Sequence, residues 1–437
     1  MSARLSCPPA PGPLETYAVQ FDSLLHTLAQ RQGFRTYLTG LLLPRERLKT
    51  LTGLAGAEPL VQAQTAPVQR LQFFLSEATW DAASINAQRL ALLRATPDMA
   101  PSAAGVLVID DTGDRKEGHA IDHVARQYLG SVGKVDNGIV AVTSLWANEQ
   151  HYYPLHVTPY TPAARLADGR QDAAFRTKPD IAVDLVDQAL AAGIAFRAIV
   201  SDCFYGDNQA FESALLRRQC PYVLARRGNV SLGWARADVA HTFRQAAQAV
   251  ANSAWHKVER TFRDGHVESW WVTELTGFGY GADQRVRALC ATTDRRILPE
   301  ISTWYLTTNL SKQQASLAEI VRLYGLRNWV EQSYKQMKNE LGWADFMVRS
   351  DRAIRRHWTL VFCAFSFCWW HAAYRSRISD ASTQPALPSP ARKKNRPHHP
   401  RYPDVLAARP ASGAGVARTG ALAHTLPARV VRHTPAA

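Results

Sequence analysis

Apolar side chains recur at helical spacing from residue 15 to about residue 100. Leu24 and Leu28 begin this pattern, and residues 80–93 continue it. Apolar residues three and four positions apart form one face of an α-helix, and Asp81 is of a type that caps helix N-termini. The pattern therefore predicts an all-α N-terminal domain over residues 15–100.

The period of the apolar positions changes at about residue 105. A short apolar run at residues 106–109 is typical of a buried strand and ends in Asp110 and Asp111. Three strands followed by helix, strand, helix and strand indicate an α/β domain with a mixed sheet over residues 105–225. The other predicted strands are at residues 137–146, 151–157, 196–200 and 222–225, and the predicted helices are at residues 181–192 and 210–218.

Residues 226–302 favour strands and turns again, which indicates a β-rich insertion. A second part of the α/β core is expected over residues 303–378. It has a strand at residues 304–307 and helices at residues 312–323 and 325–343. The insertion itself is expected to hold strands at residues 268–275 and 285–291, separated by the glycine-rich residues 277–281.

The apolar run at residues 358–374 is a candidate membrane span by hydropathy alone. A span needs about 20 predominantly apolar residues, and His371 and the flanking arginines shorten this run. We therefore expect a buried packing helix there, and no membrane partner.

Composition limits the class of protein and its partners. The chain has 437 residues, 46% of them hydrophobic, which excludes a wholly disordered or fibrous protein. Six cysteines without a Cys-x2-Cys pair do not indicate a disulfide scaffold or a zinc ribbon. No basic stretch followed by an apolar core is visible at the N-terminus, so a cytoplasmic protein is expected.

The net charge of +14 is unevenly distributed. Residues 383–437 hold nine Lys and Arg against Asp404 alone, a net charge of +8, which leaves +6 for the rest of the chain. This segment is also rich in Pro and Ala, so we expect a disordered basic tail there. A basic balance favours nucleic acid as partner.

Three acidic positions carry the candidate chemistry. Asp110 and Asp111 follow the first predicted strand of the α/β domain, and Asp202 follows the strand at residues 196–200. Strand ends in α/β sheets are common places for catalytic groups. Two carboxylates there can share a cation such as Mg²⁺, and a third allows a second ion, so that the pair acts on a phosphodiester.

The third acid is suggested by the helix predicted at residues 325–343. At about 100° per residue, one stripe of its surface holds a single acid among basic and aromatic residues, and an opposite stripe is apolar. Such a face suits a carboxylate metal ligand flanked by phosphate contacts, although Glu331 and Lys335 could also be an ordinary i,i+4 pair. The polar stripe consists of Tyr324, Arg327, Glu331, Lys335 and Lys338, and the apolar stripe of Leu326, Val330, Met337 and Leu341.

Four of these residues match a family signature. Tyr324, Arg327, Glu331 and Lys338 have the spacing Y-(2)-R-(3)-E-(6)-K, which resembles that of bacterial insertion-sequence transposases of the DDE superfamily. The VLVIDDTG segment at residues 106–113 and the DCFYGD segment at residues 202–207 also resemble one branch of this group, although Phe204 stands where the family's motif usually has glycine.

The resemblance implies an RNase H-like mixed-sheet catalytic core with a β-rich insertion between the second and third acids. It assigns Asp202 as the second acid and Glu331 as the third, with all three acids as metal ligands. The first acid is open at this point, because the apolar run before it favours Asp111 and a D-x-T spacing favours Asp110. We expect Asp111.

The resemblance also implies metal-dependent cleavage of DNA at the element ends and transfer of the 3′-OH to target DNA. The resemblance implies two Mg²⁺ ions as cofactors, with Mn²⁺ as a possible replacement. The expected partner is double-stranded DNA, bound by a homodimer in association with the bacterial nucleoid. The helical domain at residues 15–100 would then serve DNA binding or dimerisation. Tyr324, Arg327 and Lys338 would contact the DNA, and Lys335 lies on the same stripe. One alternative is a catalytically inactive, decayed DNA-binding remnant of such an element. A glycosidase with paired carboxylates is another, and it predicts neither metal dependence nor DNA affinity.

Overall fold

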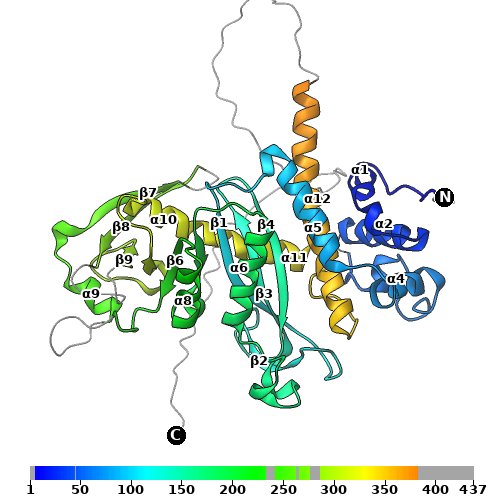
Figure 1. The fold of residues 1–437 in the computed structure, drawn as a ribbon, viewed down its shortest axis with the longest axis horizontal. Coiled ribbons are helices and arrows are strands. Elements are labelled where there is room, and N and C mark those ends of the chain that lie inside the picture. Colours follow the sequence, from blue (N-terminus) through cyan, green and yellow to red (C-terminus); the bar gives the residue numbers. More distant parts are fainter. Residues whose placement is uncertain (1–4, 45, 233–241, 262–264, 276–285, 382–437) are drawn as a thin grey trace, which may run out of the picture. The chain divides into compact units, whose positions relative to one another are not determined.

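The computed structural model describes residues 5–44, 46–232, 242–261, 265–275 and 286–381. The glycine-rich residues 277–281 and the basic tail at residues 383–437, both singled out in the sequence, lie outside these ranges. Within the described ranges, ten strands form one continuous sheet with helices packed against it (Figure 1).

The centre of the sheet has the predicted mixed topology. The long strands β1 (Val106–Arg115), β3 (Lys134–Ala147) and β4 (Tyr152–Tyr160) form an antiparallel meander, and β5 (Ile199–Ser201) and β6 (Tyr222–Arg226) continue it parallel to β1. This is the RNase H-like arrangement, so the predicted fold class is confirmed. A short strand that the apolar pattern did not indicate, β2 (Ala125–Leu129), pairs with the beginning of β3.

The insertion extends this sheet rather than forming a separate one. Its strands β7 (His256–Thr261), β8 (Val267–Glu274) and β9 (Arg287–Thr292) pair in order, and β10 (Thr303–Thr308) joins β9 to β6. Helix α9 (Phe243–Ala249) covers the insertion. Together they enclose a hydrophobic cluster that includes Phe243, Trp255, Cys290 and Tyr305.

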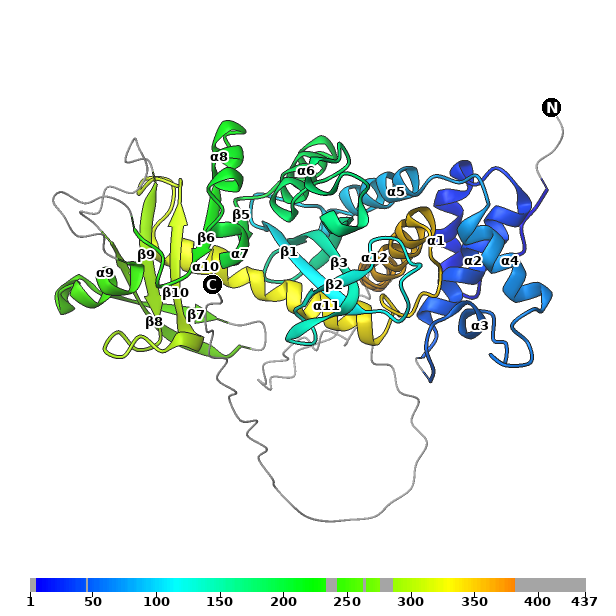
Figure 2. The same cartoon turned by 90° about the horizontal axis from the view of Figure 1, so that it is seen from below.

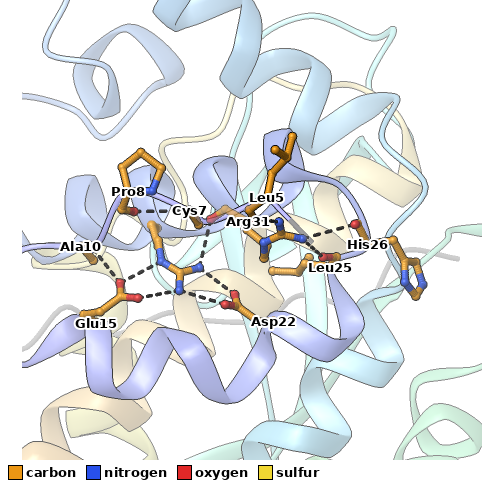
Figure 3. Close-up of polar contacts among 10 residues, drawn as sticks. Leu5, Cys7, Pro8, Ala10, Glu15, Asp22, Leu25, His26 and Arg31 are labelled. Carbon is orange, nitrogen blue, oxygen red and sulfur yellow. Dashed lines mark hydrogen bonds and ion pairs between the residues drawn. The ribbon is translucent and has the colours of Figure 1, made fainter. Parts of the chain in front are cut away.

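The N-terminal segment is helical, as the apolar spacing predicts. Its α-helices are α1 (Leu14–Ala18), α2 (Leu28–Leu42), α3 (Leu51–Leu54), α4 (Ala66–Ser76) and α5 (Ala82–Ala95), with the 3-10 helices η1 (Val19–Leu24) and η2 (Pro97–Met99). Asp81 caps α5 by accepting a hydrogen bond from the Ser84 amide. Buried guanidinium groups hold the first helices together (Figure 3).

Two arginines on α2 account for most of the contacts in Figure 3. Arg35 donates to Glu15 Oε2 at 2.8 Å and to Asp22 Oδ1 at 2.7 Å, and Arg31 donates to the carbonyl groups of Leu25 and Leu5. Charged hydrogen bonds of this kind offset the cost of burying the guanidinium groups.

Helix α12 (Asp351–Ala381) connects the N-terminal helices to the sheet, since it packs against α2, α4, α5 and β4. The residues predicted as a packing helix, 358–374, lie within it, and Trp358, Phe362 and Phe365 are buried. None of the helices in the described part of the chain is long and apolar enough to cross a membrane.

Helices cover both faces of the central sheet (Figure 2). On one side lie α6 (Lys178–Ala191), which packs on β3 and β4, and α8 (Gln209–Arg217), which packs on α6. On the other side, α11 (Trp329–Asn339) packs on β1 and β4, after α10 (Leu317–Gly325) and the 3-10 turn η7 (Leu326–Asn328). The short helix α7 (Cys203–Gly206) follows β5 directly.

Candidate active site

The first two acidic positions lie on adjacent parallel strands. Ile109 of β1 is paired in register with Ser201 of β5. Asp110 and Asp202 follow this pair directly, Asp110 within β1 and Asp202 just after the end of β5. Residues in register point to the same face of a sheet. Asp202 remains extended before the chain turns into α7, and its carboxylate caps α7 by accepting from the Phe204 amide at 3.1 Å.

The expectation that Asp110 and Asp111 end their strand is wrong. β1 continues to Arg115, because its pairing with β3 extends to Arg115 and Gly138. The strand that ends at this level is β5, at Ser201. The acids therefore lie in the middle of β1, at the level where the neighbouring strand stops.

Successive residues of a strand point to opposite faces, so Asp110 and Asp111 differ in surroundings. Asp110 is the register partner of Thr143 on β3, and the Thr143 hydroxyl forms a hydrogen bond with the Tyr334 hydroxyl of α11 at 2.5 Å. Asp110 therefore faces α11. Asp111 accepts a hydrogen bond from Lys178 of α6 at 3.2 Å and one from the Tyr205 hydroxyl at 3.1 Å.

Asp110 is buried and contacts one cation. Its Oδ2 atom lies 2.6 Å from Nη2 of Arg327 in η7. Burial raises the pKa of Asp110 to about 7, the Arg327 charge opposes this rise, and the negative charges of Asp202 and Asp111 add to it. The three carboxyl groups are therefore close enough to interact electrostatically.

Asp202 has the same kind of electrostatic environment. Burial raises its pKa, the guanidinium of Arg327 lowers it, and the charge of Asp111 raises it further. Arg327 thus acts on both Asp110 and Asp202. Its own Nε atom is buried and has no hydrogen-bond partner.

Glu331 lies in the first turn of α11 and is exposed. Burial lowers the pKa of Arg327, and the charges of Asp110, Tyr324, Asp202 and, last, Glu331 raise it above its ordinary value. Within the described ranges, no three His, Cys, Asp or Glu side chains are grouped closely enough to hold a metal ion. The structure thus brings Asp110 and Asp202 together with Arg327, and leaves Glu331 at the solvent side.

The predicted polar stripe is divided between three elements. The expectation of one helix through residues 325–343 is wrong, because α10 ends at Gly325 and the 3-10 turn η7 separates it from α11. Tyr324 is buried at the end of α10, and its ring lies 4.9 Å from that of Trp304. The apolar stripe is as expected, since Leu326, Val330, Met337 and Leu341 are all buried.

The two lysines of the stripe differ in their contacts. Lys335 is exposed on α11. Lys338 Nζ lies 2.7 Å from Asp114 Oδ1 and donates to the Gly113 carbonyl at 3.2 Å. Asp114 also accepts from the Trp343 indole. Strand β1 thus presents three acids, Asp110, Asp111 and Asp114, each with a basic side chain beside it.

Sequence reasoning did not identify Lys178, Tyr205, Asp114 or Tyr334 as neighbours of the site. Asp114 has a local signal, because it is four residues after Asp110 on the same strand and hence on the same face. The other three come from separate elements, and only the fold brings them to β1.

Two family models match this chain. Residues 20–256 match the family model of the DDE superfamily endonucleases, and residues 176–367 match that of the transposase DDE domain. Over 334 residues, 76% of this chain and 81% of the relative, the chain is 32% identical to a probable transposase for insertion sequence element IS701 from Microchaete diplosiphon.

Among solved structures, a piggyBac transposase synaptic complex with hairpin DNA is similar, with a TM-score of 0.42 and 13% identity, over 80% of this chain and 67% of that one. That likeness is too distant to bear on individual residues. The match to the endonuclease model over more than half of the chain and the 32% identical relative are each sufficient to show the family. The chain therefore belongs to the DDE superfamily, among the transposases of insertion sequences.

Proposed function

We propose that this transposase uses divalent metal ions to cleave DNA strands at the ends of its element, and transfers the resulting 3′-OH to target DNA. The main support is the pair Asp110 and Asp202, a buried and a half-buried carboxyl group at the point where β5 ends beside β1. Carboxylate oxygens on adjacent strands are the donors that Mg²⁺ and Mn²⁺ prefer.

We assign Asp110, and not Asp111, as the first acid. Asp110 is on the face of the sheet that α11 covers, and it shares Arg327 with Asp202. Asp111 is on the opposite face, where Lys178 and Tyr205 bind its carboxylate. The strand geometry therefore favours Asp110, which the D-x-T spacing indicates, over Asp111, which the apolar run indicates.

We assign Glu331 as the third acid. The contact between Tyr334 and Thr143 fixes α11 over the strand position of Asp110, and Glu331 precedes Tyr334 by three residues, which is less than one turn. Glu331 and Asp110 both act on the guanidinium of Arg327. They therefore lie on the same side of the sheet.

The three carboxylates are oxygen donors of the type that Mg²⁺ prefers. The side chains of the described residues are not grouped closely enough to hold an ion, so ion binding would draw Glu331 towards Asp110 and Asp202. Asp110 is buried beside Asp202, so this position requires a positive charge, and Arg327 supplies one with its Nε atom left unpaired. Asp110, Asp202 and Glu331 would hold two Mg²⁺ ions. When bound, such ions neutralise charge on the phosphodiester and lower the pKa of an attacking water.

The basic residues of the signature would position the DNA. Arg327 and Lys338 lie against acids of β1, and Lys335 is exposed one helical turn after Glu331. Arginine and lysine at this edge attract phosphate groups and hold the scissile bond near the acids. Tyr324 is buried, so its proposed part is to support Arg327 rather than to bind DNA through exposed surface. We also propose that a homodimer binds the two ends.

The proposal is tested by strand cleavage on the element's own ends with Mg²⁺. Asp110→Asn, Asp202→Asn and Glu331→Gln should each lower the cleavage rate by about 100-fold or more while DNA binding survives. Asp111→Asn is the matched control, and it should lose less than about 10-fold.

Two other outcomes would change the account. Loss of cleavage in Asp111→Asn with normal cleavage in Asp110→Asn would exchange the two assignments. A wild-type protein that binds the ends but never cuts them, with either Mg²⁺ or Mn²⁺, would identify a decayed remnant.

A further inference from the structure

The acids have a second flank, formed by residues that the family signature does not include. Phe204 is two residues after Asp202, and Lys178 begins α6. The Lys178 ammonium group lies 5.2 Å from the centre of the Phe204 ring and 5.8 Å from that of Tyr160, the last residue of β4. These three residues lie on the Asp111 side of β1, opposite the flank that carries Arg327 and Glu331.

Phe204 does not serve the hydrophobic core. Its side chain is 53% exposed, whereas its neighbour Tyr205 is fully buried. The two rings meet edge to face, with centres 5.1 Å apart and an interplanar angle of 84°. Since the Tyr205 hydroxyl donates to Asp111, Phe204 is held against a fixed neighbour while most of its ring faces outward.

Lys178 places a positive charge beside the Phe204 ring. Its ammonium group contacts Asp111 at 3.2 Å and is only partly exposed, so it is held beside the Phe204 ring. An exposed aromatic ring beside a fixed cation is the combination that binds a nucleobase and the phosphate next to it. The ring accepts any base by stacking, and the cation attracts the backbone.

We propose that Phe204 stacks on the nucleobase next to the reactive phosphate, and that Lys178 contacts the backbone of the same nucleotide. This inference rests on the proposed function, because it requires the reactive phosphate to bind between the flank of Phe204 and Lys178 and the flank that carries the proposed third acid. The base belongs either to the element end, beside the bond that is cut, or to the target DNA, beside the bond that receives the 3′-OH.

The test combines protein and DNA changes. Binding and cleavage are measured for wild type and Phe204→Ala on intact element ends and on ends with a single abasic site at each position flanking the cut. Stacking predicts that Phe204→Ala weakens binding or cleavage about 10-fold on intact DNA, and that this loss disappears when the contacted base is already absent. If the contacted base belongs to the target DNA, the same comparison is made by measuring strand transfer into targets with single abasic sites.

Three further variants make the result interpretable. Phe204→Trp keeps an aromatic ring and should restore wild-type behaviour. Leu190→Ala truncates an exposed apolar side chain, 43% exposed near the other end of α6, and should change nothing. Lys178→Gln should reduce the salt dependence of DNA binding by about one phosphate contact.

The inference is overturned if Phe204→Ala behaves as wild type, or if its loss is equal on intact DNA and at every abasic position in both DNAs. The proposed function would survive that result, provided that Mg²⁺-dependent cleavage still requires Asp110 and Glu331. Absence of cleavage in the wild-type protein, by contrast, removes the proposed function itself.

Discussion

Asp110 is subject to two opposing electrostatic effects. It is buried, which raises its pKa to about 7, and it lies 2.6 Å from a guanidinium group that opposes this rise. Breaking a buried ion pair by removing one partner leaves the other charge uncompensated and destabilises the folded protein. The stability of the site therefore depends on the pair, independently of any reaction.

Arg327→Ala should lower the free energy of unfolding by about 2–4 kcal/mol at pH 8, measured by chemical denaturation with a chelator present. The carboxyl group of Asp110 then lacks its partner. Adding Asp110→Asn removes the unpaired charge, so the double variant should be more stable than Arg327→Ala alone. A double variant that is no more stable than the single one would show that the pair contributes little.

At the residue scale, the sequence singled out Asp202, Glu331 and both candidates for the first acid as predicted metal ligands, because each lies in a recognisable motif. It favoured Asp111 as the first acid, whereas we propose Asp110. That choice depends on which face of β1 meets α11, and the pairing of β1 with β3 and β5 determines the face. Lys178 comes from α6 and leaves no local signal. Tyr205 lies in the DCFYGD segment, and only the fold shows that its hydroxyl reaches Asp111.

At the scale of elements, predictions from apolar spacing were accurate for a strand with a continuous buried stretch and for a helix with one buried face. The strand predicted at residues 137–146 is β3, and the helix predicted at residues 181–192 is α6. The errors are the missed strand β2 and the positions of ends and breaks. Pairing extended β1 beyond its apolar run, and the turn η7 interrupted a stripe that reads as one continuous helix.

Helix α12 makes stability depend on pH through His357. This side chain is buried, bonds with the Tyr37 hydroxyl at 2.8 Å, and has its Nε2 3.1 Å from the Gly342 carbonyl. Burial, followed by the charge of Lys116, lowers the pKa of His357 to about 3 from the ordinary value of 6.5. Between about pH 6.5 and pH 3, His357 is therefore protonated in the unfolded chain and neutral in the folded chain.

The free energy of unfolding should thus fall on acidification, by about 2 kcal/mol for one such histidine between pH 6.5 and pH 5. His156, whose pKa burial also lowers to about 3, adds a loss of the same sign. Denaturant unfolding at a series of pH values measures the slope. His357→Gln should reduce that slope, and an unchanged slope would remove His357 as its source.

At the scale of the molecule, buried arginines join the N-terminal helices to the sheet. Arg89 of α5 is fully buried and donates to the carbonyl groups of Pro154 and Leu155 on β4 and to the Ser366 hydroxyl on α12. The sequence predicted the helices and the sheet as successive segments. It could not predict this connection, because arginine is ordinarily a surface residue.

Arg89→Met should lower the free energy of unfolding by about 3 kcal/mol or more, because it leaves buried carbonyl groups without donors. The helices and the sheet share this contact, so we expect them to unfold in one transition, with tryptophan fluorescence and circular dichroism giving the same midpoint. Two separate transitions, of which Arg89→Met shifts only one, would contradict this coupling.

The central claim is that Asp110, Asp202 and Glu331, from two strands and one helix, bind the same metal ions. Anomalous scattering from a crystal of the protein with its element-end DNA and Mn²⁺ locates those ions directly. The account predicts peaks within about 2.5 Å of oxygen atoms of all three residues. Peaks bound by Asp111, or peaks beyond the reach of Glu331, would contradict it.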